Sequence, residues 1–112
     1  MITDTTYRQV LEAVEEEISL PRGWLLGSKT EDATDARYIL CHYLNACGMS
    51  SAQIQAATGL RKSTVNIMLA KGKGRMGRRR ITYLWWLQIG RRLEGLTGKT
   101  VDVYNLPLPC QY

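Results

Sequence analysis

The stretch Ser50–Ala70, with the sequence SSAQIQAATGLRKSTVNIMLA, predicts two short helices joined by a tight turn. Ser50 and Gln53 have the spacing of a capping box, in which each side chain bonds the backbone N–H of the other residue and fixes a helix start. Gly59 then supplies the positive φ that ends this helix and turns the chain. The pattern is typical of a helix-turn-helix with its turn at residues 58–60.

The second of these helices divides into an inward and an outward face, because its apolar residues recur at helical spacing. The inward residues are Leu60, Val65, Met68 and Leu69. The outward residues are Arg61, Lys62, Ser63, Asn66, Ile67 and Ala70. Such side chains contact bases and phosphates, so we expect Asn66 to pair with adenine, and Arg61 or Lys62 to contact guanine or phosphate. The alternative is a purely structural helix pair with a solvated Asn66.

The distribution of charge supports a polyanionic partner. Residues 1–37 contain eight acidic and four basic residues, whereas residues 38–112 contain two acidic and eleven basic ones. Ten basic residues and no acidic one lie between Arg61 and Arg92. This asymmetry indicates a nucleic-acid-binding face. A membrane surface would also attract such charge, but the basic residues do not accompany a free apolar helix face.

The segment Lys71–Arg80 has six basic residues and three glycines in ten positions, which predicts a charged, flexible connector that grips phosphate. A solubilising loop is the alternative. The complete predicted DNA-contacting set is Arg61, Lys62, Ser63, Thr64, Asn66, Lys71, Lys73, Arg75, Arg78, Arg79 and Arg80. Within this set, Asn66→Ala should lose discrimination at one or two base positions, whereas Arg79→Ala should weaken all duplexes about equally.

Length and composition indicate one soluble domain. The chain has 112 residues, of which 45% are apolar and 22% are charged, and it has no run of eighteen apolar residues. Residues 1–10 have neither the basic start nor the apolar segment of a secretion signal, so we do not expect secretion. Three cysteines, Cys41, Cys47 and Cys110, are an odd number without C-x-x-C spacing. Reduced thiols in a cytoplasmic protein fit this pattern.

Three further helices and a tail are expected around the central pair. Apolar spacing predicts helices at about Asp4–Ser19, Asp32–Ala46 and Arg79–Leu96, with Asp32 as the N-cap of the second and a short apolar plug at residues 24–26. The inward stripe expected for the last helix is Ile81, Leu84, Trp85, Gln88, Ile89, Arg92, Leu93 and Leu96.

That last helix carries more apolar surface than a small domain needs, once Trp86 and Leu87 are counted. We therefore expect it to contribute to a homodimer contact. Residues 99–112 are expected to form either an extended dimerisation arm or a disordered end. Residues 1–98 would then be a helical DNA-binding domain with its helix-turn-helix at 50–71.

The order of segments over Ile2–Leu69 resembles the C-terminal DNA-binding domain of the bacterial replication initiator DnaA, within the Trp-repressor-like class. The resemblance is carried by Ile18–Leu20, Leu26–Lys29, Ala36–Arg37 and Gly59–Val65. It implies an all-α helix-turn-helix bundle of about five helices. Because Leu60, Arg61 and Lys62 stand where that family has Arg-Asp-His, the resemblance does not imply the same DNA sequence preference.

No pattern in the sequence predicts catalysis, a metal site or a cofactor. The single histidine, His42, lies among apolar helix residues without further ligands at metal-binding spacing. The sequence therefore favours a double-stranded DNA-binding protein, most simply a dimeric transcriptional regulator of a bacterium, phage or mobile element. An origin-binding or accessory replication factor, and a protein-interaction module that docks through the helix of Trp85, are the alternatives.

Overall fold

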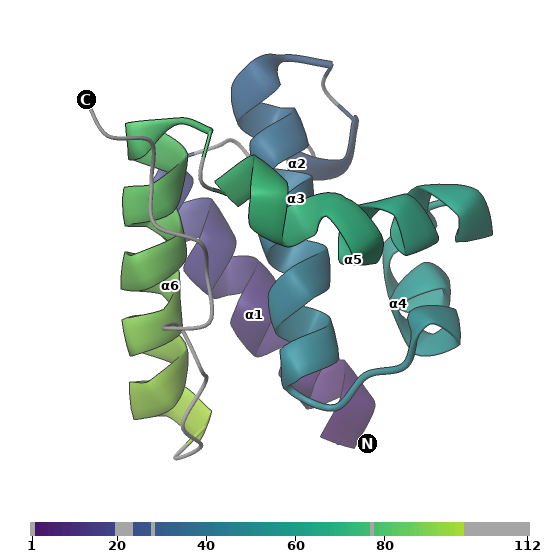
Figure 1. Ribbon diagram of the computed structural model, residues 1–112. Coiled ribbons are helices and arrows are strands. Elements are labelled where there is room, and N and C mark those ends of the chain that lie inside the picture. The colour runs from purple at the N-terminus through teal and green to yellow at the C-terminus, as the bar shows by residue number, and fades with distance from the viewer. Residues whose placement is uncertain (1, 20–23, 28, 77, 98–112) are drawn as a thin grey trace.

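The computed structural model describes residues 2–19, 24–27, 29–76 and 78–97; the side chains at 2–4, 24, 73, 76 and 94–97 lie outside this description. The described part contains six helices and no strand, which confirms the predicted all-α bundle (Figure 1). The helices are α1 (Ile2–Ile18), α2 (Trp24–Gly27), α3 (Glu31–Ala46), α4 (Ser51–Thr58), α5 (Lys62–Met76) and α6 (Arg80–Thr97). The expected apolar plug is the short helix α2. The predicted tail and the boundary at residue 98 lie outside the described residues.

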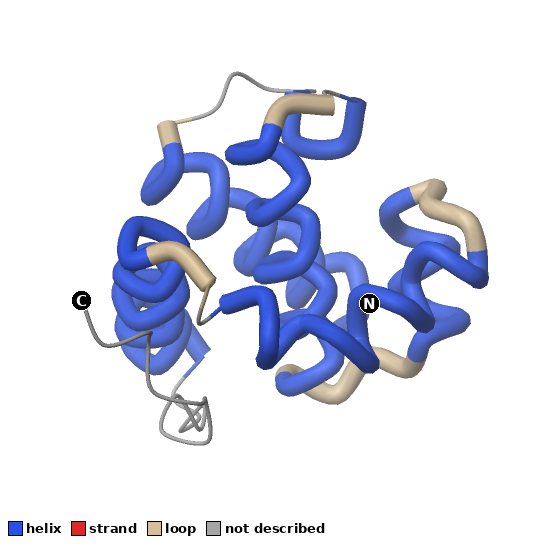
Figure 2. The backbone as a smooth tube through the Cα atoms, turned by 45° about the horizontal axis from the view of Figure 1, so that its top comes forward, coloured by secondary structure: helices blue, strands red, loops and turns tan. Residues whose placement is uncertain are grey.

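Helix α3 is the centre of the bundle, because it packs against each of the other five helices. Both ribbon and tube views place α4 and the start of α5 at one side of the molecule and α6 at the other (Figures 1 and 2). The largest fully buried side chains are Trp86, Tyr43, Leu25, Ile39, Leu40, Leu44, Ile54, Ile89, Leu93, Val10 and Val14. None of the described helices is both long enough and apolar enough to cross a bilayer.

The N-terminus of α3 corrects one prediction from the sequence. Thr30, and not Asp32, is the N-cap: its side chain accepts a hydrogen bond from the Ala33 N–H at 3.3 Å. Asp32 lies in the first turn instead, where a carboxylate interacts favourably with the helix dipole. Its side chain also forms an ion pair at 3.1 Å with Arg79, the residue directly before α6.

The inward stripe predicted for α6 was partly wrong. Ile89 and Leu93 are buried as predicted, but Thr82 and Trp86 are buried as well, whereas Ile81 and Leu84 are 42% and 43% exposed. Trp86 packs against the rings of His42 and Tyr43, with centroids 4.0 and 4.8 Å away, and the Tyr43 hydroxyl donates to the Trp86 carbonyl at 2.6 Å. The wide apolar band was compatible with more than one orientation of α6 about its axis. The contacts of Trp86 with His42 and Tyr43 on α3 select one of them.

Two further residues of the predicted stripe lie at the surface. Gln88 is exposed, and Arg92 is a surface residue whose guanidinium pairs with Glu16 of α1 at 2.8 Å and with Glu17 at 3.4 Å. These ion pairs join the first and last helices. They also place some of the basic charge near the end of the chain against acidic charge near its start.

Helix α5 extends to Met76, so most of the segment that was predicted as a flexible connector is helical. Two contacts with α3 explain the extension. Gly72 is buried beside the Tyr38 ring, where a Cβ atom would lie 4.0 Å from that ring's Cδ1. One turn later the Arg75 guanidinium lies 4.8 Å from the centroid of the same ring. The glycines and the charge suggested flexibility, but packing on Tyr38 stabilises a helix.

Candidate nucleic-acid interface

The start of α4 has the predicted capping box. The Ser50 hydroxyl accepts a hydrogen bond from the Gln53 N–H at 3.2 Å, and the side-chain Oε1 of Gln53 accepts one from the Ser50 N–H at 2.9 Å. Ile54, one residue further, is fully buried. The cap thus fixes where α4 begins, and Ile54 fixes which side of α4 faces the core.

The turn between α4 and α5 is closed by two neighbouring residues. Gly59 has φ 77°, as predicted, and its N–H donates to the Gln55 carbonyl at 2.9 Å. The Thr58 hydroxyl donates to the Ile54 carbonyl at 2.7 Å and accepts from the Leu60 N–H at 3.2 Å. This role of Thr58 was not predicted from the sequence. A hydroxyl residue directly before a C-cap glycine was the available signal.

The outer face of α5 is formed by Lys62, Ser63, Asn66, Ile67, Ala70, Lys71 and Gly74, each of which is exposed. Arg61, directly before the helix, is exposed as well, and its carbonyl accepts the first helical hydrogen bond, from the Val65 N–H at 3.0 Å. Val65 and Met68 are buried, and Leu60 and Leu69 are half-buried. The predicted division of this helix into two faces is therefore confirmed.

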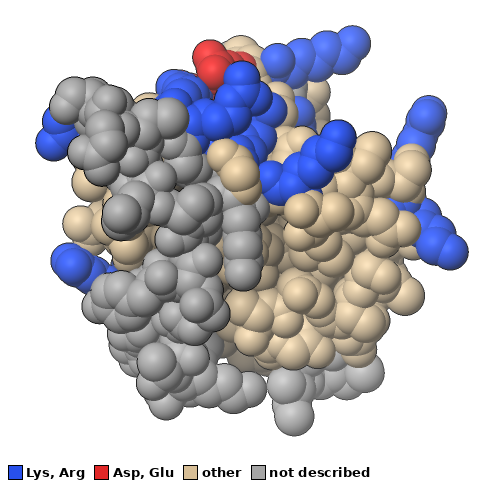
Figure 3. All heavy atoms as spheres, in the orientation of Figure 1, with Lys and Arg blue, Asp and Glu red and all other residues tan. Residues whose placement is uncertain are grey.

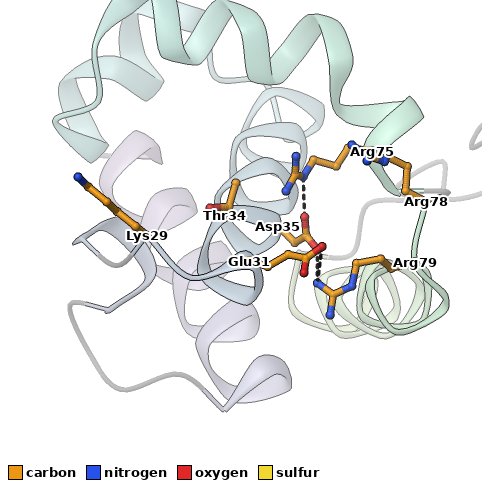
Figure 4. Close-up of a pocket in the computed structure, with 7 residues that line it drawn as sticks. All are labelled: Lys29, Glu31, Thr34, Asp35, Arg75, Arg78 and Arg79. Carbon is orange, nitrogen blue, oxygen red and sulfur yellow. Dashed lines mark hydrogen bonds and ion pairs between the residues drawn. The ribbon is translucent and has the colours of Figure 1, made fainter.

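The last turn of α5 has different surroundings, because Arg75 in this turn and Arg79 after it meet a buried carboxylate (Figure 4). Asp35 of α3 has a side chain only 2% exposed, and it binds Arg75 Nε at 2.6 Å and Arg79 Nη1 at 2.7 Å. The Thr82 hydroxyl of α6 donates to the same carboxylate at 2.8 Å. We name Asp35, Arg75, Arg79 and Thr82 the Asp35 cluster; it joins α3, α5 and α6.

Arg79 is held by further acidic groups at the surface. It contacts Asp32 at 3.1 Å and Glu31 at 3.7 Å in addition to Asp35. Partial burial acts to lower the pKa of Arg79, but the hydrogen bonds to Asp32 and Asp35 outweigh it and the pKa is raised. The guanidinium is therefore charged at any pH at which the protein is folded.

A polar pocket opens beside this cluster and is lined by Lys29, Glu31, Thr34, Asp35, Arg75, Arg78 and Arg79. Figure 4 shows Arg75 and Arg79 directed toward the two carboxylates, whereas Lys29 points away from them. The pocket thus places basic and acidic side chains next to one another. Its geometry is that of a structural ion-pair network.

Among the described residues, charge over the rest of this side of the molecule is mainly positive. In Figure 3 their Lys and Arg side chains stand out along the upper part and at the right and left edges, and their acidic atoms are visible only at the top. The sequences of α4 and α5 contain no acidic residue. A polyanion that approached the outer face of α5 would meet no carboxylate from either helix.

The predicted DNA-contacting residues consequently fall into separate groups. Arg61, Lys62, Ser63 and Asn66 are exposed together at the start of α5, with Thr64 half-buried beside them. Lys71, Arg78 and Arg80 are exposed further along the chain. Arg75 and Arg79 belong to the Asp35 cluster, and the side chain of Lys73 lies outside the description. The role of Asp35 was not predicted from the sequence, although an acidic residue among the inward alanines of α3 was the signal.

The Cys41 thiol is buried and poorly ionised. Burial raises the pKa of the Cys41 thiol to about 12, and its Sγ lies 3.8 Å from the Met68 sulfur. Within the described ranges no three residues of the types His, Cys, Asp and Glu are grouped to hold a metal ion. Comparison with protein-family models, with curated proteins and with solved structures finds no match for this chain.

Proposed function

We propose that this chain binds double-stranded DNA, with α5 in the major groove and α4 crossing above it, and that it regulates transcription in the cytoplasm of a bacterial cell. It would act as a binding protein and not as an enzyme. The proposal assigns a base contact to Asn66 and phosphate contacts to Arg61, Lys62, Lys71 and Arg78.

One observation carries this proposal: the bend at Gly59 leaves Arg61, Lys62 and Asn66 exposed together on a ridge without acidic neighbours in α4 or α5. Their burial by the rest of the fold would have excluded a groove contact. The cation at Arg61 lies at the N-terminus of α5, where the helix dipole disfavours it. A phosphate bound there would relieve that repulsion and would also accept hydrogen bonds from free N–H groups of the first turn.

Arg75 and Arg79 are omitted from the proposed contact set, because the Asp35 cluster engages both. The Arg79→Ala experiment is therefore a poor test of phosphate binding: the substitution would also remove three ion pairs to α3. Arg78 is the better choice, because it is exposed and adjacent in sequence.

The proposed assembly is a homodimer through the outer side of α6, so that two copies read two half-sites. Apart from Ile67, the described large apolar side chains with high exposure are Ile81 and Leu84, which lie one turn apart on α6. Leu84→Glu should leave a monomer in sedimentation equilibrium. A wild-type chain that sediments as a monomer at all concentrations would contradict the dimer and leave DNA binding as a separate question.

The test of DNA binding is a salt titration with a labelled random duplex of about 24 base pairs, read by fluorescence anisotropy. Neutralising about four phosphates should give a slope of about −3 to −4 in a plot of log K against log salt. Lys62→Ala and Arg78→Ala should each make the slope shallower by about one, whereas Arg8→Ala on α1 is the matched control. A chain that binds no duplex at low salt would favour a protein-interaction module through α6.

A further inference from the structure

The middle of the outer face of α5 is neutral, and the basic residues lie to its sides. Ser63, Ile67, Ala70 and Gly74 are spaced by four, three and four residues, so they form one stripe along the helix. All four are exposed, and a Cβ atom built at Gly74 would meet nothing within 4 Å. Lys62 and Lys71 lie on opposite margins of this stripe at helical spacing.

Ile67 is the large side chain of that stripe. It is 48% exposed, the highest value among the described large apolar side chains, and its neighbours Ser63 and Ala70 are small. Its branched side chain therefore projects beyond the rest of the stripe. An isoleucine exposed to this extent loses apolar burial unless something covers it.

We propose that Ile67 contacts the C5-methyl group of a pyrimidine in the major groove, and so makes the chain selective for thymine beside the position that Asn66 reads. This inference rests on the proposed DNA binding and specifies what α5 recognises. The C5-methyl group is the apolar feature that the base edges of the major groove present. Thymine carries it in ordinary DNA, and 5-methylcytosine carries it at the same place.

The charge around Ile67 favours a DNA groove over a protein as the partner of this side chain. The core of a protein interface is a continuous apolar patch depleted of charge, whereas Ile67 is a single large apolar side chain between Lys62 and Lys71. A groove matches this arrangement: phosphates lie at its two edges, where the lysines are, and base edges lie between them. The small residues along the stripe would let the helix approach those edges closely.

The experiment compares duplexes that differ by methyl groups alone. A duplex selected by the wild-type protein from a random pool is resynthesised with deoxyuridine in place of each thymidine in turn, which removes one methyl and keeps every hydrogen-bonding group. At the contacted position we expect about a fourfold loss of affinity, the factor for burying one methyl group. In the second arm, 5-methylcytosine replaces cytosine at that position in a duplex whose thymine has been exchanged for cytosine, and it should bind better than unmodified cytosine.

Variants assign the effect to one side chain. Ile67→Ala should bring the ratio of the affinities for the thymine and uracil duplexes close to one. It should leave the affinity for the uracil duplex nearly unchanged. Ile18→Ala on α1 is the matched control, because Ile18 is the same residue type, is half-buried and lies outside both α5 and the proposed dimer face, and it should keep the wild-type ratio. Thermal unfolding monitored by circular dichroism confirms that both variants are folded.

The outcomes separate the two proposals. Equal affinity for thymine and uracil at every position, or a ratio that survives Ile67→Ala, would overturn the assignment of Ile67 and leave DNA binding intact. If only 5-methylcytosine gives the effect, the methyl contact holds and selectivity for thymine is overturned. Failure of the wild-type chain to select any duplex would overturn the proposed function and this inference with it.

Discussion

The two ends of α5 carry similar basic residues in different surroundings. At its start, Arg61 and Lys62 are exposed, and neither α4 nor α5 contributes a carboxylate. At its end, Arg75 and the following Arg79 bind Asp35, which is almost completely buried. The difference shows that sequence charge has two uses here: the first pair is available to a partner, and the second pair fixes how α5 meets α3 and α6. The following predictions test that contrast.

The largest effect is expected at the buried carboxylate. Asp35→Asn leaves Arg75, Arg79 and Thr82 with one neutral acceptor, and we expect the free energy of unfolding to fall by about 2–3 kcal/mol. This lies below the range for fully buried pairs, because the two arginines are 24% and 31% exposed. Urea denaturation measures this change in the free energy of unfolding. Asp32→Asn is the control: Asp32 also contacts Arg79 but is 53% exposed, so its loss should be under about 1 kcal/mol. If the two variants lost equal free energy of unfolding, the burial of Asp35 would add nothing to its contribution to stability.

The next effect concerns the backbone at the two ends. Gly59→Ala should lower the free energy of unfolding by about 1–2 kcal/mol, because φ 77° is strained for a residue with a Cβ although no atom obstructs the new methyl group. Gly74→Ala, also unobstructed but within α5, should raise it by about 0.5–1 kcal/mol. Thermal or urea unfolding of both variants tests this contrast, because their free energies of unfolding should change in opposite directions. A stabilising Gly59→Ala would contradict the turn as described.

Salt dependence of DNA binding should separate the two groups of cations directly. Lys62→Ala should make the log–log salt slope shallower by about one without a measurable change in unfolding, because Lys62 is exposed. Arg75→Ala should do the reverse: it should lower stability and leave the slope of the folded protein unchanged. Anisotropy titrations over a range of salt, paired with urea curves, measure both. A slope change for Arg75→Ala equal to that of Lys62→Ala would remove the distinction.

The smallest effect lies at the middle of α5, where Met68 packs against Cys41. Burial raises the pKa of the Cys41 thiol from 9.0 to about 12. Below pH 9 the thiol is protonated in both states, so it adds no pH dependence; between about 9 and 12 it ionises only when unfolded, and stability is lost as pH rises. The stability difference between wild type and Cys41→Ala should therefore shrink by about 0.8 kcal/mol from pH 8 to pH 9.5. A difference that stays constant with pH would show that the thiol is accessible to water.

The sequence predicted local features well where a few neighbouring residues decide the outcome. The capping box of Ser50 and Gln53, the left-handed Gly59 and the two faces of α5 depend on contacts within one or two turns, so spacing was sufficient to find them. The helix predicted at about Asp4–Ser19 followed from the same periodicity, and its Val10 and Val14 are buried.

Features that depend on long-range partners were placed only by the tertiary structure. The phase of α6 depends on Trp86 meeting His42 and Tyr43, forty-odd residues earlier in the chain. The extent of α5 and the role of Arg75 depend on Tyr38 and Asp35 of α3. By itself the sequence determined the all-α class and the turn at Gly59, because short-range backbone preferences set both. Only the fold decided which basic residues stay exposed, because a carboxylate distant in sequence neutralises a cation only after the chain brings the two together.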